Sequence, residues 1–187
     1  MKSRANLSPF VAVFASWAPK LHAHYHGALR KVENKTGAKR YFPGSAFAAA
    51  TVNLGPAVCT FVHRDMKNLA YGMCAITALG KFDHKKGGHL ILWDAKLIIE
   101  FPAGSTIFIP SATLSHSNVP IQSGERRASF TQYSAGGLFR WVDNQFKTDI
   151  QLQRAPAAYR RILAERAGGW TRGLAMLPTL QELVANV

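Results

Sequence analysis

The sequence is poor in acidic residues and in cysteine. Its 187 residues hold 10 Asp and Glu against 23 Lys and Arg, which gives a formal net charge of +13 and a pI near 10.2. The two cysteines, Cys59 and Cys74, are too few for a disulfide framework or for a structural zinc site of their own. We therefore expect a reduced intracellular protein.

Long apolar runs are also missing, and we find neither an internal repeat nor a low-complexity tract. No stretch is long enough to span a membrane. The run from Leu7 to Ala18 resembles the core of a signal peptide. Its apolar residues recur at helical spacing, however, with Ser8 as a candidate cap and Pro9 at the first helical position, which favours an amphipathic helix packed on the domain. Pro19 is expected to kink or divide that helix.

From about Ser45 the hydrophobic pattern changes from a helical period to alternation. Short strands follow one another at spacings of roughly ten residues with turn pairs between them, which is typical of a sandwich or a jelly roll. The predicted strands are Ala46–Asn53, Ala57–Val62, Met73–Leu79, His89–Trp93, Lys96–Phe101, Ser105–Pro110, Arg127–Tyr133 and Leu138–Val142.

Apolar residues make up 48% of the chain, which is enough for one packed core and excludes a disordered protein. After Asn144 the pattern is helical again, at Ala157–Ala167 and Thr179–Ala185. We expect a mainly β, α+β fold in a single domain over residues 1–187. It would consist of a basic helical segment (1–45), a jelly-roll (double-stranded β-helix) core (46–143) and C-terminal helices (144–187).

Metal chemistry is indicated by His63-Arg64-Asp65 at the end of a predicted strand. Residues two apart on a strand share a face, so His63 and Asp65 point the same way. A distant histidine would complete a 2-His-1-carboxylate triad, which binds Fe(II) and leaves positions open for a cosubstrate and oxygen. His116 lies 53 residues downstream, where a jelly roll brings a late strand back beside an early one. The alternative is an ordinary surface turn.

A carboxylate site is indicated eleven residues past His116. On the alternating strand Arg127 and Ser129 share one face, whereas Arg126 lies on the other. A guanidinium holds a carboxylate with two parallel hydrogen bonds, and a neighbouring hydroxyl donates a further one. One of the two arginines is then an exposed basic residue, and we keep Arg126 as the second choice for the ligand.

These motifs resemble a known family. His-x-Asp, a later His and an Arg-x-Ser strand form the pattern of Fe(II)/2-oxoglutarate dioxygenases. The segment His63-Arg64-Asp65-Met66-Lys67-Asn68 resembles the His-Arg-Asp-x-x-Asn segment of the TET/JBP family of nucleic-acid methyl-base oxygenases. The stretch from Ala46 to Val142, roughly half of the chain, resembles compact fungal versions of that family, which are often associated with mobile elements.

The resemblance implies site residues and cofactors. It makes His63, Asp65 and His116 the catalytic iron ligands. It implies that Arg127 and Ser129 bind the distal carboxylate of the cosubstrate 2-oxoglutarate, and that O2 is the oxidant. It also makes Asn68 a candidate for reading a substrate base; the alternative is that Asn68 only caps the turn. One departure concerns the substrate, because Ala135 stands where TET-type enzymes carry a base-binding His.

The expected function is oxidation of a methyl or other C–H group, foremost on a nucleic-acid base. Residues 1–50 hold 8 basic residues and 1 acidic one, which favours a polyanionic partner, DNA or RNA, although such charge also occurs in proteins that merely repel one another. The candidate backbone clamp consists of Arg30, Lys31, Lys35, Lys39 and Arg40. We expect no membrane association, assume a monomer, and expect a nuclear location if the substrate is DNA.

Three alternatives remain open. The first alternative is an oxygenase of the same class whose substrate is a small molecule or a protein instead of a nucleic acid. A cupin-type metal protein is the second alternative, since Pro102-x-Gly104 followed by His116-x-Asn118 resembles a cupin motif, but the His-x-His pair of cupins is missing. The third is an inactive relic of a mobile element.

Overall fold

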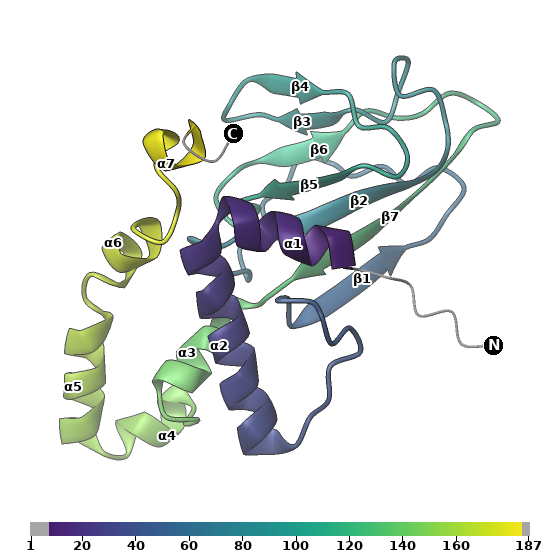
Figure 1. The fold of residues 1–187 in the computed structure, drawn as a ribbon. Helices are drawn as coiled ribbons and strands as arrows, with labels where there is room; N and C mark the ends of the chain where they lie inside the picture. The colour runs from purple at the N-terminus through teal and green to yellow at the C-terminus, as the bar shows by residue number, and fades with distance from the viewer. Residues whose placement is uncertain (1–7, 185–187) are drawn as a thin grey trace. The chain divides into compact units, whose positions relative to one another are not determined.

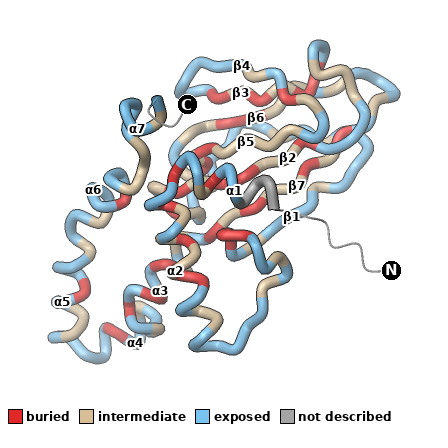
Figure 2. The backbone as a smooth tube through the Cα atoms, in the orientation of Figure 1, coloured by how far each residue is buried: buried red, intermediate tan, exposed pale blue. Residues whose placement is uncertain are grey.

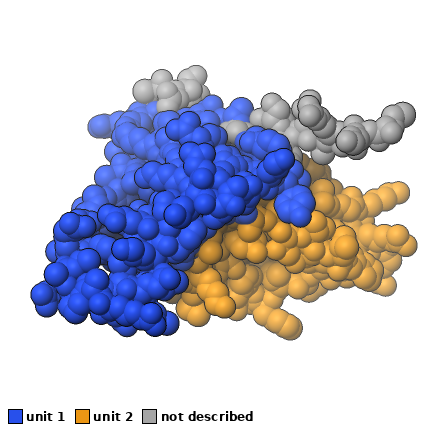
Figure 3. All heavy atoms as spheres, turned by 90° about the horizontal axis from the view of Figure 1, so that it is seen from below, with its two compact units in different colours: residues 1–48, 136–187 blue, residues 49–135 orange. Residues whose placement is uncertain are grey.

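The computed structural model describes residues 8–184 and divides the chain into two compact units (Figures 1 and 3). The helical unit consists of the segments up to Ala48 and from Gly136 on, and the sheet unit spans Ala49–Ala135. Two predicted positions, Leu7 at the start of the N-terminal helix and Ala185 at the end of the last one, lie outside the described residues.

The helical unit begins with two helices that Pro19 separates. Ala18 leaves the helical conformation (φ −139°, ψ 63°) and Pro19 opens the second helix, as predicted from a residue that cannot donate a backbone hydrogen bond. The helices of this unit are α1 (Ser8–Trp17), α2 (Pro19–Thr36), α3 (Gly136–Asp143), α4 (Asp149–Gln153), α5 (Pro156–Arg166), α6 (Gly169–Leu174) and α7 (Leu180–Val184).

Aromatic rings hold the first helices of this unit together. Tyr25 on α2 is 1% exposed and meets the rings of Phe14, Phe47 and Phe139 edge-on, at centroid distances of 5.6, 5.6 and 5.0 Å. Phe14 and Phe47 stack on each other at 5.4 Å. These contacts join α1, α2 and α3 because large rings bury much apolar surface for little conformational entropy.

The sheet unit contains two antiparallel sheets, and the predicted α+β class is confirmed (Figure 1). The strand order in both sheets is not sequential, as in a jelly roll. The four-stranded sheet has the order β1 (Ala49–Asn53), β7 (Arg126–Tyr133), β2 (Cys74–Lys81) and β5 (Thr106–Ile109). The three-stranded sheet has the order β4 (Leu97–Ile99), β3 (Leu90–Leu92) and β6 (His116–Asn118).

The two sheets share one apolar core. Cys74, Ala78 and Ile109 of the larger sheet cluster with Leu90 and Leu92 of the smaller one, and all are buried (Figure 2). Alternate residues of a strand point to opposite faces, so the inward face of each sheet is apolar here. The polar residues that are buried in this unit are therefore exceptions, and they gather along β6 and β7.

Three strand predictions differ from the structure. Leu138–Val142 is part of α3, because Phe139 and Val142 are buried three residues apart on one helix face, and so short an apolar run does not distinguish a helix from a strand. Ala57–Val62 is not a strand: Phe61 and Val62 are exposed, and the segment bonds to β6 and β7 only at single residues. Conversely, β6 was not predicted, because His-Ser-Asn has no apolar alternation.

Gly80 lies where the backbone of β7 approaches β2 closely. It lies opposite Arg127 with φ +122°, and a Cβ there would collide with the backbone of Arg126 and Arg127. Gly104 also has a positive φ (+90°) but open space around it. We expect Gly104→Ala to lower the free energy of unfolding by about 1–2 kcal/mol and Gly80→Ala by about 2–5 kcal/mol, measured by urea unfolding. Equal losses would show that backbone conformation alone, not the close approach of β7, requires Gly80.

Candidate active site

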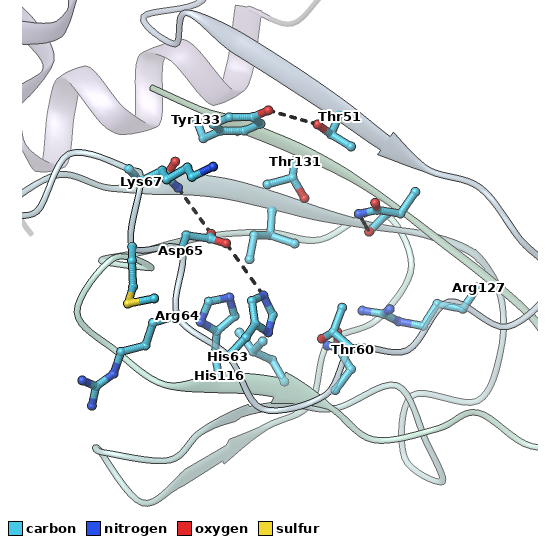
Figure 4. Close-up of a pocket in the computed structure, with 17 residues that line it drawn as sticks. Thr51, Thr60, His63, Arg64, Asp65, Lys67, His116, Arg127, Thr131 and Tyr133 are labelled. Atoms are coloured by element: carbon cyan, nitrogen blue, oxygen red, sulfur yellow. Dashed lines mark hydrogen bonds and ion pairs between the residues drawn. The ribbon is translucent and has the colours of Figure 1, made fainter. Parts of the chain in front are cut away.

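A cavity of about 560 Å³ lies within the sheet unit (Figure 4). The residues that line it include the three candidate metal ligands, both members of the candidate carboxylate site and Asn68: His63, Asp65, Asn68, His116, Arg127 and Ser129. Residues predicted separately from sequence spacing thus line one cavity. Arg126, the second choice for the carboxylate, is exposed on the other face of β7 and does not line it.

The backbone brings the two histidines side by side. His63 donates its N–H to the carbonyl of His116 (3.1 Å) and His116 returns one to His63 (2.9 Å), so residues 53 apart form an antiparallel bridge. Asp65 donates its own N–H to the carbonyl of Ser111 (2.9 Å). The result is that one ligand atom from each of His63, Asp65 and His116 lies within 4.8 Å of the other two.

Both imidazoles are oriented in the same way. The Nδ1 of His63 bonds the carbonyl of Phe61 (2.8 Å), and the Nδ1 of His116 bonds the carbonyl of Leu114 (2.9 Å). A carbonyl oxygen only accepts, so each Nδ1 carries a proton, and in the neutral tautomer each Nε2 then has the lone pair that a metal needs. Burial lowers the pKa of His116, which favours the neutral form that a metal requires.

Arg127 is a buried cation with unused hydrogen-bond donors. Its side chain is 1% exposed, and its Nη1 donates to the carbonyl of Val58 (2.9 Å). Its Nε and Nη2 have no hydrogen-bond partner among the described residues. Desolvation lowers the pKa of Arg127, and the guanidinium lies 6.0 Å from the ring of Phe82. Burying an unpaired charge costs free energy, and an anionic ligand bound to this guanidinium would offset that cost.

The alternation predicted for β7 is present. Arg127 and Ser129 are both buried, and the same face continues to Thr131 and Tyr133, which also line the cavity. The Ser129 hydroxyl accepts a hydrogen bond from the amide of Asn53 (2.9 Å). Tyr133 was not singled out from the sequence, although the same two-residue period identifies it.

Other cavity residues carried no signal in the sequence. The hydroxyl of Thr60 bonds the side-chain oxygen of Asn118 (3.0 Å) across two segments that lie far apart in the chain. Thr51 on β1 lies 3.3 Å from the Tyr133 hydroxyl. Isolated threonine and asparagine residues have no spacing that distinguishes them from surface residues, so only the fold reveals them.

Asn68 lies next to the candidate metal group. Its side-chain nitrogen donates to Asp65 Oδ2 (3.3 Å) and to the hydroxyl of Ser111 (3.1 Å), and its backbone N–H donates to the carbonyl of Asp65 (2.8 Å). On its other side it forms an isolated bridge with Ala135. Asn68 therefore does cap the turn after Asp65, and its side chain also contacts a candidate ligand.

The five basic residues proposed as a clamp belong to the helical unit and differ among themselves. Arg40 is half-buried, and its guanidinium forms two bonds to the Glu33 carboxylate and one to the carbonyl of Ser45 (3.0 Å). The same pairing lowers the pKa of Glu33. Arg40 therefore stabilises the helical unit and is removed from the candidate clamp, because its donors are already engaged. The exposed members are Arg30, Lys31, Lys35 and Lys39.

Within residues 8–184, we find no helix with the length and apolarity needed to cross a bilayer.

Comparison with known proteins gives distant structural neighbours. No protein-family model matches the chain, and no curated protein matches it either. The chain is similar to NgTET1 in complex with 5mC DNA, with 16% identity and a TM-score of 0.45 over 71% of this chain and 55% of that one. It is also similar to the viral collagen prolyl hydroxylase vCPH of Paramecium Bursaria Chlorella virus-1 in its 2OG complex, with 16% identity and a TM-score of 0.34 over 58% of this chain and 70% of that one. The matched region thus spans about half of the NgTET1 chain.

Proposed function

We propose that this protein is an Fe(II)- and 2-oxoglutarate-dependent oxygenase. The observation that carries the proposal is one cavity with two complementary features. It contains three potential metal-ligand atoms within 4.8 Å of one another, and it contains the buried guanidinium of Arg127 with two nitrogens that lack partners. A metal group alone fits many proteins, whereas a metal group that shares a cavity with an unpaired buried cation fits a metal-binding anion such as a keto acid.

The donor set suits Fe(II). Two neutral imidazole nitrogens and one carboxylate oxygen form the facial set that non-haem iron oxygenases use, and three protein ligands leave positions for other molecules. Bound Fe(II) supplies the redox chemistry, in which 2-oxoglutarate and O2 give succinate, CO2 and a hydroxylated substrate. The cupin alternative requires a His-x-His pair, and His63-Arg64-Asp65 lacks it.

The residues of the chain orient the metal ligands and bind the cosubstrate. The carbonyls of Phe61 and Leu114 hold the imidazoles with Nε2 directed away from the backbone contact. Arg127 donates its free N–H groups to the distal carboxylate of 2-oxoglutarate, and Ser129 contributes a hydroxyl on the same face. A charge-assisted bond in a site that excludes water is stronger than one at the surface.

We further propose a nucleic-acid base as the substrate. The exposed basic residues of α2 and the net charge of +13 favour a polyanion. In the sheet unit, the side chains of Phe61 and Met66 are 95% and 85% exposed on either side of His63 and Asp65, and Lys67 lies on the same segment and lines the cavity. Exposed apolar side chains beside a cationic one provide a surface on which a base can stack. A base in a duplex would have to be flipped out to reach the cavity.

The metal group is tested by substitution. His63→Ala, Asp65→Ala and His116→Ala should each reduce Fe(II)-dependent succinate release by at least about 100-fold, because each removes a ligand. Circular dichroism should remain that of the wild type, since the sheets do not depend on the ion. His84→Ala is the matched control, because His84 pairs with Glu100 outside the cavity. A wild-type protein that neither binds 2-oxoglutarate nor releases succinate with Fe(II), with methylated oligonucleotides or small substrates, contradicts the proposal.

The carboxylate site is tested with the two neighbouring arginines. Arg127→Gln removes the guanidinium and its charge, so the KM for 2-oxoglutarate should rise by roughly 30- to 900-fold, the equivalent of about 2–4 kcal/mol. Arg126→Gln, on the exposed face, should leave that KM unchanged. The measurement is succinate release as a function of 2-oxoglutarate concentration. Greater sensitivity at Arg126 would assign the cosubstrate to the other face of β7.

The nucleic-acid partner is tested by salt dependence. The logarithm of the binding constant for an oligonucleotide should fall linearly with the logarithm of salt concentration, and charge reversal of four clamp residues should reduce the slope by about 3. The reversed residues are Arg30, Lys31, Lys35 and Lys39.

The matched control reverses four exposed basic residues elsewhere, Lys85, Lys96, Arg154 and Arg160. It changes the net charge equally, so an equal loss of slope would assign binding to net charge and not to the clamp residues. Binding that ignores ionic strength would contradict the nucleic-acid substrate, and a small molecule or a protein would replace it.

A further inference from the structure

We infer that Asn68 is a positioning residue that holds the Asp65 carboxylate in its metal-binding orientation. The inference rests on the proposed metal site and assigns Asn68 a role other than the base reading that the family resemblance implies. It is drawn from the contacts of three residues, Asp65, Asn68 and Ser111, which form a closed set of hydrogen bonds beside the cavity.

The turn after Asp65 brings the two side chains together. The backbone N–H of Asn68 donates to the carbonyl of Asp65 (2.8 Å), so the chain folds back over three residues. This places the Asn68 amide nitrogen 3.3 Å from Asp65 Oδ2. A turn of this kind needs no particular side chain at its last position, so the amide contact is an addition to the turn and not a requirement of it.

The two carboxylate oxygens of Asp65 have different surroundings. Oδ1 lies 3.8 Å from Nε2 of His63, which is another candidate ligand atom (Figure 4). Oδ2 accepts the amide of Asn68. A carboxylate that is free to rotate exchanges its oxygens and can chelate with both, whereas one that is held at Oδ2 presents Oδ1 alone. Asn68 therefore selects one-oxygen ligation and keeps a coordination position free for the cosubstrate or O2.

Ser111 in turn fixes Asn68. The Ser111 hydroxyl accepts the second amide hydrogen (3.1 Å), Ser111 is 1% exposed, and its carbonyl accepts the backbone N–H of Asp65 (2.9 Å). Behind it, the thiol of Cys74 is hydrogen-bonded to Ser111, and burial raises the pKa of that thiol to about 12, so the thiol keeps its proton. The contacts lead from Cys74 in the apolar core through Ser111 and Asn68 to Oδ2 of Asp65, so the fold sets the orientation of the carboxylate.

The same contacts limit what Asn68 offers a substrate. Its amide has two hydrogens, and both are donated within the chain, to Asp65 and to Ser111. A flipped amide would set its oxygen against the carboxylate, which is repulsive. Asn68 therefore retains only an acceptor oxygen toward a base. Ala135, which replaces the base-binding histidine expected from the resemblance, pairs with Asn68 and adds no polar side chain.

The experiment measures metal affinity without catalysis. Metal-free protein is titrated with Co(II) under nitrogen, and the visible absorption of the bound ion reports both affinity and geometry. Asn68→Leu preserves the volume of the side chain but not its donors, and should weaken Co(II) binding by about 10- to 100-fold and alter the spectrum. Asn68→Ala should do the same. Thermal unfolding of the metal-free variants checks that the fold is retained.

Two further variants separate positioning from general damage. Ser111→Ala should weaken Co(II) binding less than Asn68→Leu does, and the double variant should bind no more weakly than Asn68→Leu, because Ser111 acts through Asn68. Asn53→Leu is the matched control: its amide donates to Ser129 in the same cavity, so Co(II) affinity should stay at the wild-type value. If the losses of Co(II) affinity caused by Asn68→Leu and Ser111→Ala add up in the double variant, Ser111 does not act through Asn68 and the inference is overturned.

The failures of the inference and of the proposed function differ. Wild-type protein that does not bind Co(II) contradicts the metal site itself. Wild-type protein that binds Co(II) while both Asn68 variants bind it equally well contradicts only the positioning role. If those variants keep Co(II) affinity and lose turnover on one methylated base alone, Asn68 reads the substrate and the inference is wrong.

Discussion

The sheet unit buries one cation, the guanidinium of Arg127, and this burial constrains what the surrounding residues and any ligand can be. The backbone N–H of Arg127 donates to the carbonyl of Pro56 and its carbonyl accepts from the N–H of Val58, so one segment holds its backbone from one side, and Gly80 of β2 lies on the other side. Gly80 lies opposite because no Cβ fits there, and the ring of Phe82 near the guanidinium is itself accommodated by Gly88. A fold that buries a cation with spare donors is completed by an anion, which links the architecture to the chemistry.

The candidate metal group shows a second kind of preorganisation, in which the backbone sets the geometry and the side chains follow it. The bridge between His63 and His116 fixes two histidines through main-chain bonds, and each ring is then oriented by a carbonyl two residues earlier in the chain. Asp65 is fixed by Ser111 through its N–H and by Asn68 through its Oδ2. Because the ligand atoms are held before any ion binds, the site does not have to order its side chains on binding.

The sequence predicted the parts of this arrangement that follow a period. The alternation of β7 separates Arg127 from Arg126, and the spacing of His63 and Asp65 puts both beside one cavity. The parts without a period were missed or misjudged. β6 is polar because it lines the cavity, so its composition does not indicate a strand. Arg40 counts as a free charge until the fold shows its bonds to Glu33, seven residues away. The contact of Asn68 with Asp65 depends on the turn between them, which the motif alone does not reveal.

The two units differ in charge, and the proposed partner and the proposed cosubstrate fall on different units. The sheet unit has 8 Lys and Arg against 5 Asp and Glu, and it contains every residue that lines the cavity. The remaining segments carry 15 Lys and Arg against 5 Asp and Glu, including the exposed basic residues of α2. The proposed attraction of a polyanion would arise mainly from the helical segments, whereas the proposed contacts to a keto acid belong to the sheet unit. Ionic strength would weaken the former by screening and would scarcely affect an anion bound at the buried Arg127. Under the proposed function, the attraction of the polyanion and the binding of the cosubstrate would therefore respond to different physical variables.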